Sequence, residues 1–107
     1  MTEAGPRFRR GDVWVAERAT KARLVVVVGH DGVSATREAV LVVPISDVRA
    51  STLIEPGVDD EQGHPVGVAM TPRLGEVSKE YLTGRHGRLS ADSLESLDVA
   101  LRAIFDL

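Results

Sequence analysis

The sequence of 107 residues contains no cysteine, which excludes disulfide bonds, thiolate metal sites and a cysteine nucleophile. Aromatic residues make up 4% of the chain, so aliphatic side chains must fill the core. Valine is the most frequent of these, and its β-branched side chain favours strands. No apolar run reaches the roughly eighteen residues of a membrane-spanning helix. The basic residues within 1–10 are not followed by an apolar stretch long enough for a secretion signal. We therefore expect a cytoplasmic protein with no membrane contact.

Clustered metal ligands are also missing from the sequence. The three histidines, His30, His64 and His86, are too far apart for a zinc motif. The acidic run at residues 59–61 lacks the regular ligand spacing of a hard-cation loop. The sequence thus predicts no metal and no other cofactor. An exposed loop histidine is the usual finding, although His30 beside Asp31 is the best placed of the three to donate a proton.

The charge is unevenly distributed along the chain. Its formal net value of −3 counts against a protein that binds nucleic acid through non-specific phosphate contacts. The first 52 residues nevertheless carry eight Lys/Arg and six Asp/Glu, whereas the remainder carries five and ten. A local basic surface on an acidic protein is therefore compatible with this sequence.

The hydrophobic pattern predicts a single α+β domain over residues 1–107, in which residues 1–6 fray. Short apolar segments with alternating or continuous patterns indicate strands, and Ser90 begins an apolar stripe at helical spacing. Together they predict a small antiparallel, SH3-like barrel sheet with short helices and a C-terminal helix. We expect strands at 11–17, 23–28, 39–45, 52–55, 66–70 and 74–77, a helical turn capped by Ser78 at 78–82, loops at 18–22, 29–37, 56–64 and 83–88, and a helix at 90–105.

Three blocks resemble the MazF/PemK family of toxins. Residues 10–15 read RGDVWV, residues 23–28 read RLVVVV and are followed by AVLVVPIS at 39–46, and residues 87–90 read GRLS before the terminal helix. Each block is similar to a family motif, and all occur in the family's order. This architecture is shared by CcdB-type toxins.

The resemblance implies a homodimeric, metal-independent endoribonuclease that cleaves single-stranded RNA at a short motif and is neutralised by a cognate antitoxin. The family's catalytic arginine falls on Arg23 and its catalytic threonine or serine on Ser46. This chain departs from the family in having Leu24 where a proline usually follows the arginine. The loop at 18–22 is also short, and no residue in it matches the glutamate that some members use as a base.

The chemistry of RNA cleavage explains why such residues suit the task. The 2′-hydroxyl attacks the adjacent phosphate, so the enzyme must orient the strand and stabilise the extra charge of the phosphorane. The planar guanidinium of Arg23 matches two phosphate oxygens. If the strands that carry Arg23 and Ser46 are neighbours, both residues emerge at one rim of the sheet.

Several other residues are candidates, each with a structural alternative. Arg18, Lys21 and Arg73 fit RNA phosphate contacts but also fit solvated turns. Glu17 could orient Arg23 or act as the base, yet a structural ion pair is the commoner role. Ser46 could instead be a turn residue bonded to its own backbone. Trp14 could stack a base, although half-buried packing is more common.

Two alternative functions remain open from the sequence. The first is a non-catalytic toxin of the same fold, a CcdB-like gyrase poison that acts through its C-terminal helix. The second is a degenerate paralogue that binds RNA or an antitoxin without cleaving.

Overall fold

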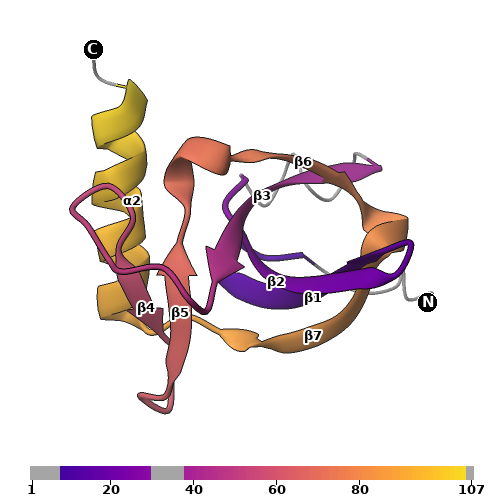
Figure 1. Ribbon diagram of the computed structural model, residues 1–107, viewed down its shortest axis with the longest axis horizontal. Coiled ribbons are helices and arrows are strands. Elements are labelled where there is room, and N and C mark those ends of the chain that lie inside the picture. The colour runs from indigo at the N-terminus through magenta and orange to yellow at the C-terminus, as the bar shows by residue number, and fades with distance from the viewer. Residues whose placement is uncertain (1–7, 30–37, 106–107) are drawn as a thin grey trace, which may run out of the picture.

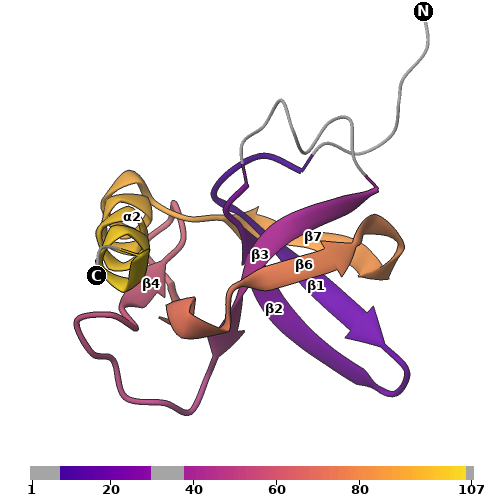
Figure 2. The same cartoon turned by 90° about the horizontal axis from the view of Figure 1, so that it is seen from above.

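The computed structural model describes residues 8–29 and 38–105, which form a curled antiparallel sheet and one long helix (Figures 1 and 2). The expected segments at 1–6 and 30–37, including His30, lie outside the described residues. Neighbouring strands follow the order β4-β5-β3-β2-β1-β7, and β6 pairs with β3. The elements are β1 (Asp12–Arg18), β2 (Lys21–Val27), β3 (Ala39–Ser46), β4 (Gly57–Asp59), β5 (Pro65–Ala69), the 3₁₀ turn η1 (Thr71–Arg73), β6 (Gly75–Ser78), the 3₁₀ turn η2 (Lys79–Tyr81), β7 (Leu82–Arg88) and α2 (Ala91–Phe105).

The sheet separates two apolar clusters. Successive strand residues point to opposite faces, so the valines of β2 and the residue after it divide between them: Val25 and Val27 join the cluster on the concave face, Val26 and Val28 the other. The expected burial of this run on both faces is confirmed. The concave cluster also contains Trp14, whose exposed fraction is 6%, and Phe8 packs against it with 4.5 Å between ring centroids and the ring planes tilted by 44°. Trp14 is therefore a core residue.

Helix α2 covers the other face of the sheet, over β4 (Figure 1). Ser90 caps it as predicted, because the Ser90 Oγ accepts a hydrogen bond from the amide of Ser93 at 3.1 Å. Leu97 is fully buried, and Leu94 and Leu101 pack at the edge of the same cluster. No helix in the described part of the chain has the length and apolar character that a membrane crossing requires.

A buried carboxylate fastens β1 to β7. The Asp12 Oδ1 accepts hydrogen bonds from Arg88 Nη1 at 3.0 Å and from Arg85 Nη2 at 3.3 Å. Its other oxygen accepts the Arg9 amide at 3.1 Å. Because a buried charge must be paired, this cluster keeps Asp12 in place at 2% exposure and gives β7 a fixed position at the edge of the sheet.

Several local predictions were wrong. The loop expected at 18–22 is shorter, because β1 extends to Arg18 and β2 begins at Lys21, and the loop expected at 56–64 contains β4. Residues 83–88 belong to strand β7 instead of a loop. The segment 52–55 is a turn, in which the amide of Thr52 donates to the carbonyl of Glu55 and the amide of Glu55 donates to the Thr52 hydroxyl; the strand comes later, at β4. Ser78 makes no side-chain cap to η2, and the amide of Lys79, the first residue of η2, donates to the carbonyl of Glu38.

Candidate functional site

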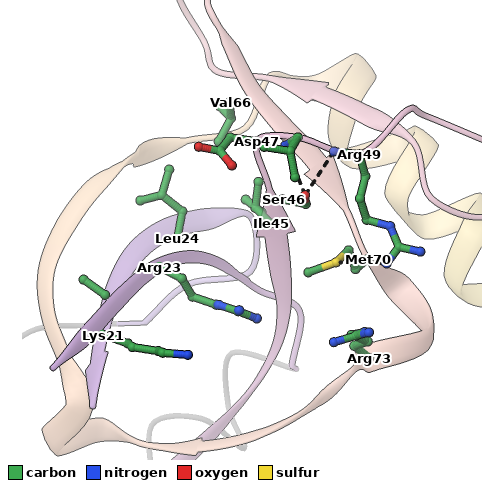
Figure 3. Close-up of a pocket in the computed structure, with 12 residues that line it drawn as sticks. Lys21, Arg23, Leu24, Ile45, Ser46, Asp47, Arg49, Val66, Met70 and Arg73 are labelled. Atoms are coloured by element: carbon green, nitrogen blue, oxygen red, sulfur yellow. Dashed lines mark hydrogen bonds between the residues drawn. The ribbon is translucent and has the colours of Figure 1, made fainter. Parts of the chain in front are cut away.

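A pocket of about 650 Å³ opens where β2 begins and β3 ends, beside η1 (Figure 3). Four of its lining side chains are basic, and Asp47 is the one carboxylate among the lining residues. The pocket's floor is apolar, with Leu24, Ile45 and Met70. The complete lining consists of Lys21, Ala22, Arg23, Leu24, Ile45, Ser46, Asp47, Val48, Arg49, Val66, Met70 and Arg73. The pocket therefore combines the charge and the shape needed to hold an anionic chain.

Arg23 and Ser46 lie at the same end of the antiparallel strands β2 and β3. In the antiparallel pairing of β2 with β3, Val25 lies opposite Pro44 and Val26 opposite Val43. This pairing ends at Val25 and Pro44, and Arg23 and Ser46 lie two residues beyond it on their respective strands. Both residues have the strand parity of the concave cluster, which directs their side chains to the same side of the sheet. Both line the pocket.

The hydroxyl of Ser46 organises the loop that follows it. Its Oγ accepts hydrogen bonds from the amides of Val48 and Arg49, each at 3.2 Å (Figure 3). The turn role considered for Ser46 from the sequence is therefore present. Since both of these bonds use the oxygen as acceptor, the hydroxyl proton stays available to donate to a ligand in the pocket.

The basic side chains enter the pocket from different elements. Lys21 and Arg23 extend from β2 into the space that Arg73 borders from η1 (Figure 3). The side chains of these three residues make no ion pair or hydrogen bond within the described part of the chain. Cations without a carboxylate partner can bind an anion without first giving up an internal ion pair, so these three are suited to phosphate.

Two other predicted residues lie elsewhere. Arg18 is not among the residues that line the pocket, and its guanidinium carbon lies 5.5 Å from the ring centroid of Tyr81. Glu17 pairs with Ala22 across the hairpin, whereas Arg23 pairs with Ala16. Alternation thus directs Glu17 to the face opposite Arg23, and it forms no ion pair within residues 8–29 and 38–105.

Arg49 and Asp47 were missed by sequence reasoning. Both directly follow the strand motif that ends in Ser46, and that adjacency was the available signal. Among the residues that the structure describes, no group of three histidine or acidic side chains could hold a metal ion. His64 instead lies in the β4–β5 turn, with its Nδ1 3.8 Å from an oxygen of Asp60.

Solved structures share this architecture along nearly their whole length. An endoribonuclease from a mycobacterial species, in complex with its cognate antitoxin, is similar with a TM-score of 0.81 and 16% identity, covering 92% of this chain and 95% of its own. The MazE–MazF complex of Deinococcus radiodurans gives 0.82 and 12%, covering 96% and 99%. The Mycobacterium tuberculosis toxin MazF-mt6 gives 0.75 and 23%, covering 90% and 97%. The fold is therefore MazF-like.

The family follows from a sequence comparison. The family model of the PemK-like, MazF-like toxins of type II toxin–antitoxin systems matches residues 9–105. Because that match spans most of the sequence, the chain belongs to this family, as the three sequence blocks suggested. The comparison with curated proteins returned no match.

Gly67 lies in close contact with Ile45 and Ser46 at the end of β3, and this contact predicts an effect of substitution on stability. Its φ is +146°, and a Cβ at this position would lie 2.6 Å from both the Ser46 carbonyl oxygen and the Ile45 Cγ2. The substitution Gly67→Ala should therefore lower the free energy of unfolding by about 1–3 kcal/mol, because backbone or core atoms must move. Denaturant titration measures this change. Gly84→Ala is the matched control, since no atom lies within 4 Å of its added Cβ; equal losses from the two variants would contradict the contact argument.

Proposed function

We propose that this chain is an endoribonuclease toxin that cleaves single-stranded RNA at a short sequence motif, without a metal, and is neutralised by a cognate antitoxin. The observation that carries the proposal is that Arg23 and Ser46 line one pocket together with three further cations. Membership of the PemK-like, MazF-like toxins supports it, as do similar structures that are endoribonucleases.

The proposed reaction uses a nucleophile that RNA itself supplies. The 2′-oxygen forms a bond to the adjacent phosphorus while the bond to the 5′-oxygen breaks. The 2′-hydroxyl loses its proton, the 5′-oxygen gains one, and the products are a 2′,3′-cyclic phosphate and a 5′-hydroxyl. The protein must therefore orient the strand and stabilise the phosphorane, and neither task requires a covalent intermediate.

Arg23 and Ser46 divide this work in our proposal. The Arg23 guanidinium binds two non-bridging oxygens of the scissile phosphate, where negative charge grows in the transition state. The Ser46 hydroxyl donates to a phosphate oxygen while its own oxygen keeps the Val48 and Arg49 amides in place. Lys21 and Arg73 attract and position the strand. Arg18 and Glu17, which do not line the pocket, have no part in the chemical step.

Removing the Arg23 guanidinium should remove most of the activity. We expect purified protein to cut single-stranded RNA in the presence of a chelator, and Arg23→Ala to slow cutting by about 100- to 1000-fold, the usual effect of losing one preorganised donor. Sequencing of the 5′-hydroxyl ends locates the cut site. A substrate with 2′-deoxyribose at that site should resist cleavage, because it lacks the nucleophile.

The control for Arg23→Ala is Arg18→Ala, which removes the same charge from the same hairpin but outside the pocket. Cleavage of the deoxy-substituted strand would refute the mechanism, and an unchanged rate in Arg23→Ala would refute the assignment of that residue. Growth arrest that survives Arg23→Ala but fails when the C-terminal residues are changed would favour the gyrase-poison alternative instead.

Two substitutions of Ser46 separate its hydroxyl from its size. Ser46→Ala leaves the amides of Val48 and Arg49 without their acceptor and removes the donor to phosphate, so we expect at least a tenfold lower cleavage rate. Ser46→Thr keeps the hydroxyl and should retain most of the activity. Cleavage rates with matched melting temperatures provide the measurement. Full activity in Ser46→Ala would limit Ser46 to a turn-forming role.

The proposed partners are a second copy of the chain and an antitoxin. Large apolar side chains are exposed on the 47–56 loop and on α2: Val48, Leu53, Ile54, Val99 and Phe105 are 86%, 87%, 40%, 48% and 69% exposed. Leu53 of the loop and Val99 of α2 line one pocket, and an exposed apolar patch of this kind marks a contact site. Light scattering should give twice the chain mass of 11.5 kDa, and co-expression with the adjacent gene product should yield an inactive complex. A monomer or the absence of a complex would count against the respective partner.

A further inference from the structure

Arg49 differs from the other cations of the pocket in that its side chain is held in place. Its Nε lies 3.6 Å from the Glu55 Oε1, and its Nη1 donates to the sulfur of buried Met70 at 3.7 Å. Lys21, Arg23 and Arg73 have no comparable contact within the described ranges. The second terminal nitrogen of Arg49, Nη2, makes no ion pair or hydrogen bond within the described ranges. The Arg49 guanidinium is therefore oriented by its other nitrogens and can still donate to a ligand through Nη2.

Glu55 is itself fixed in position. Reciprocal bonds with Thr52 hold its backbone, at 2.8 Å from the Thr52 amide to the Glu55 carbonyl and 3.0 Å from the Glu55 amide to the Thr52 hydroxyl. On its other side, the fully buried Thr71 donates its hydroxyl to the Ile54 carbonyl. The carboxylate is 13% exposed, so solvent screens its attraction for Arg49 less than it would screen a surface pair.

Arg49 and Arg73 border the pocket from the side opposite β2. Figure 3 shows the Arg49 guanidinium beside Met70, and Arg73 reaches the same space from η1, whereas Arg23 enters from β2. Two guanidinium groups that share one side of a pocket repel each other unless an anion lies between them. Glu55 offsets part of that repulsion, but it is not one of the residues that line the pocket. A negatively charged ligand inside the pocket would offset the rest.

From this geometry we propose that Arg49 and Arg73 form a subsite for the phosphodiester next to the scissile one, and that Glu55 is the positioning residue for Arg49. The inference rests on the proposed function, because it assumes that the pocket receives a single-stranded nucleic acid. A strand bound at Arg23 by one phosphate would then meet this second pair of cations with its next one. Arg49 binds substrate in this scheme and takes no part in bond breaking.

The subsite can be tested by binding alone, without cleavage. The probe is a fluorescent 12-nucleotide RNA of mixed sequence in which every sugar is 2′-O-methylated, so that it cannot be cut. Anisotropy titrations at several salt concentrations give the slope of log affinity against log salt, which changes by about 0.7 for each phosphate contact to a single strand. Arg49→Ala and Arg73→Ala should each make the slope shallower by about that amount. Arg102→Ala removes the same charge from α2, outside the pocket, and should leave the slope unchanged.

A double-mutant cycle tests the role of Glu55. Glu55→Gln removes the carboxylate charge and should weaken binding about two- to fivefold, the range of a single ion pair, with the salt slope unchanged because Arg49 remains. In the Arg49→Ala background, Glu55→Gln should have no further effect. A merely structural Glu55 would instead weaken binding equally in both backgrounds. In cleavage assays Glu55→Gln should raise KM and leave kcat within about twofold.

The outcomes separate this inference from the proposed function. An unchanged slope in Arg49→Ala would overturn the subsite even if the protein cleaves RNA. The predicted slopes in a protein that does not cleave would overturn the ribonuclease proposal and leave the subsite standing. A wild-type chain that does not bind the probe would overturn the subsite as well.

Discussion

The pairing of β2 with β3 is the constraint on which the site depends. Both strands carry valines that are buried on both faces, so a slip of one residue would exchange Val25 and Val26 between two differently shaped clusters. That cost fixes Val25 opposite Pro44. Arg23 and Ser46 lie two residues beyond this pair, and both line the pocket at that end of the strands. The ladder that aligns the core therefore also sets where the start of β2 and the end of β3 lie relative to one another.

Charge is segregated in a way that the net value conceals. The protein carries a formal charge of −3, yet four cations and a single carboxylate line the pocket. Two carboxylates outside the pocket are paired with arginines: Asp12 binds Arg85 and Arg88, and Asp98 pairs with Arg10. The net negative charge and the local cations therefore act in opposite directions on a polyanion, repelling it in general and attracting it at the pocket.

The sequence predicted the elements with strong patterns and missed those set by tertiary context. The valine strands and α2 were found because their apolar spacing is unambiguous. Strand β7 was missed because, at the edge of the sheet, it pairs with β1 alone, and Thr83, Arg85 and His86 are exposed there, so no alternation was required. The β-propensity of 52–55 was outweighed by the Thr52 hydroxyl, which accepts the Glu55 amide. The position of Arg49 in the pocket could not be predicted either, because it depends on the path of the loop that connects β3 to β4.

The loop between β3 and β4 explains why a small sheet can present several polar groups in a fixed geometry. Ser46 holds the start of the loop through two amides, and the Thr52–Glu55 turn anchors its end. Arg49 is tied to both ends, by its amide to Ser46 and by its side chain to Glu55. A loop of this kind loses little conformational entropy on binding a ligand, because folding has already ordered it. Preorganisation of a charged group costs stability in the free protein, and here the hydrogen bonds of the loop offset that cost.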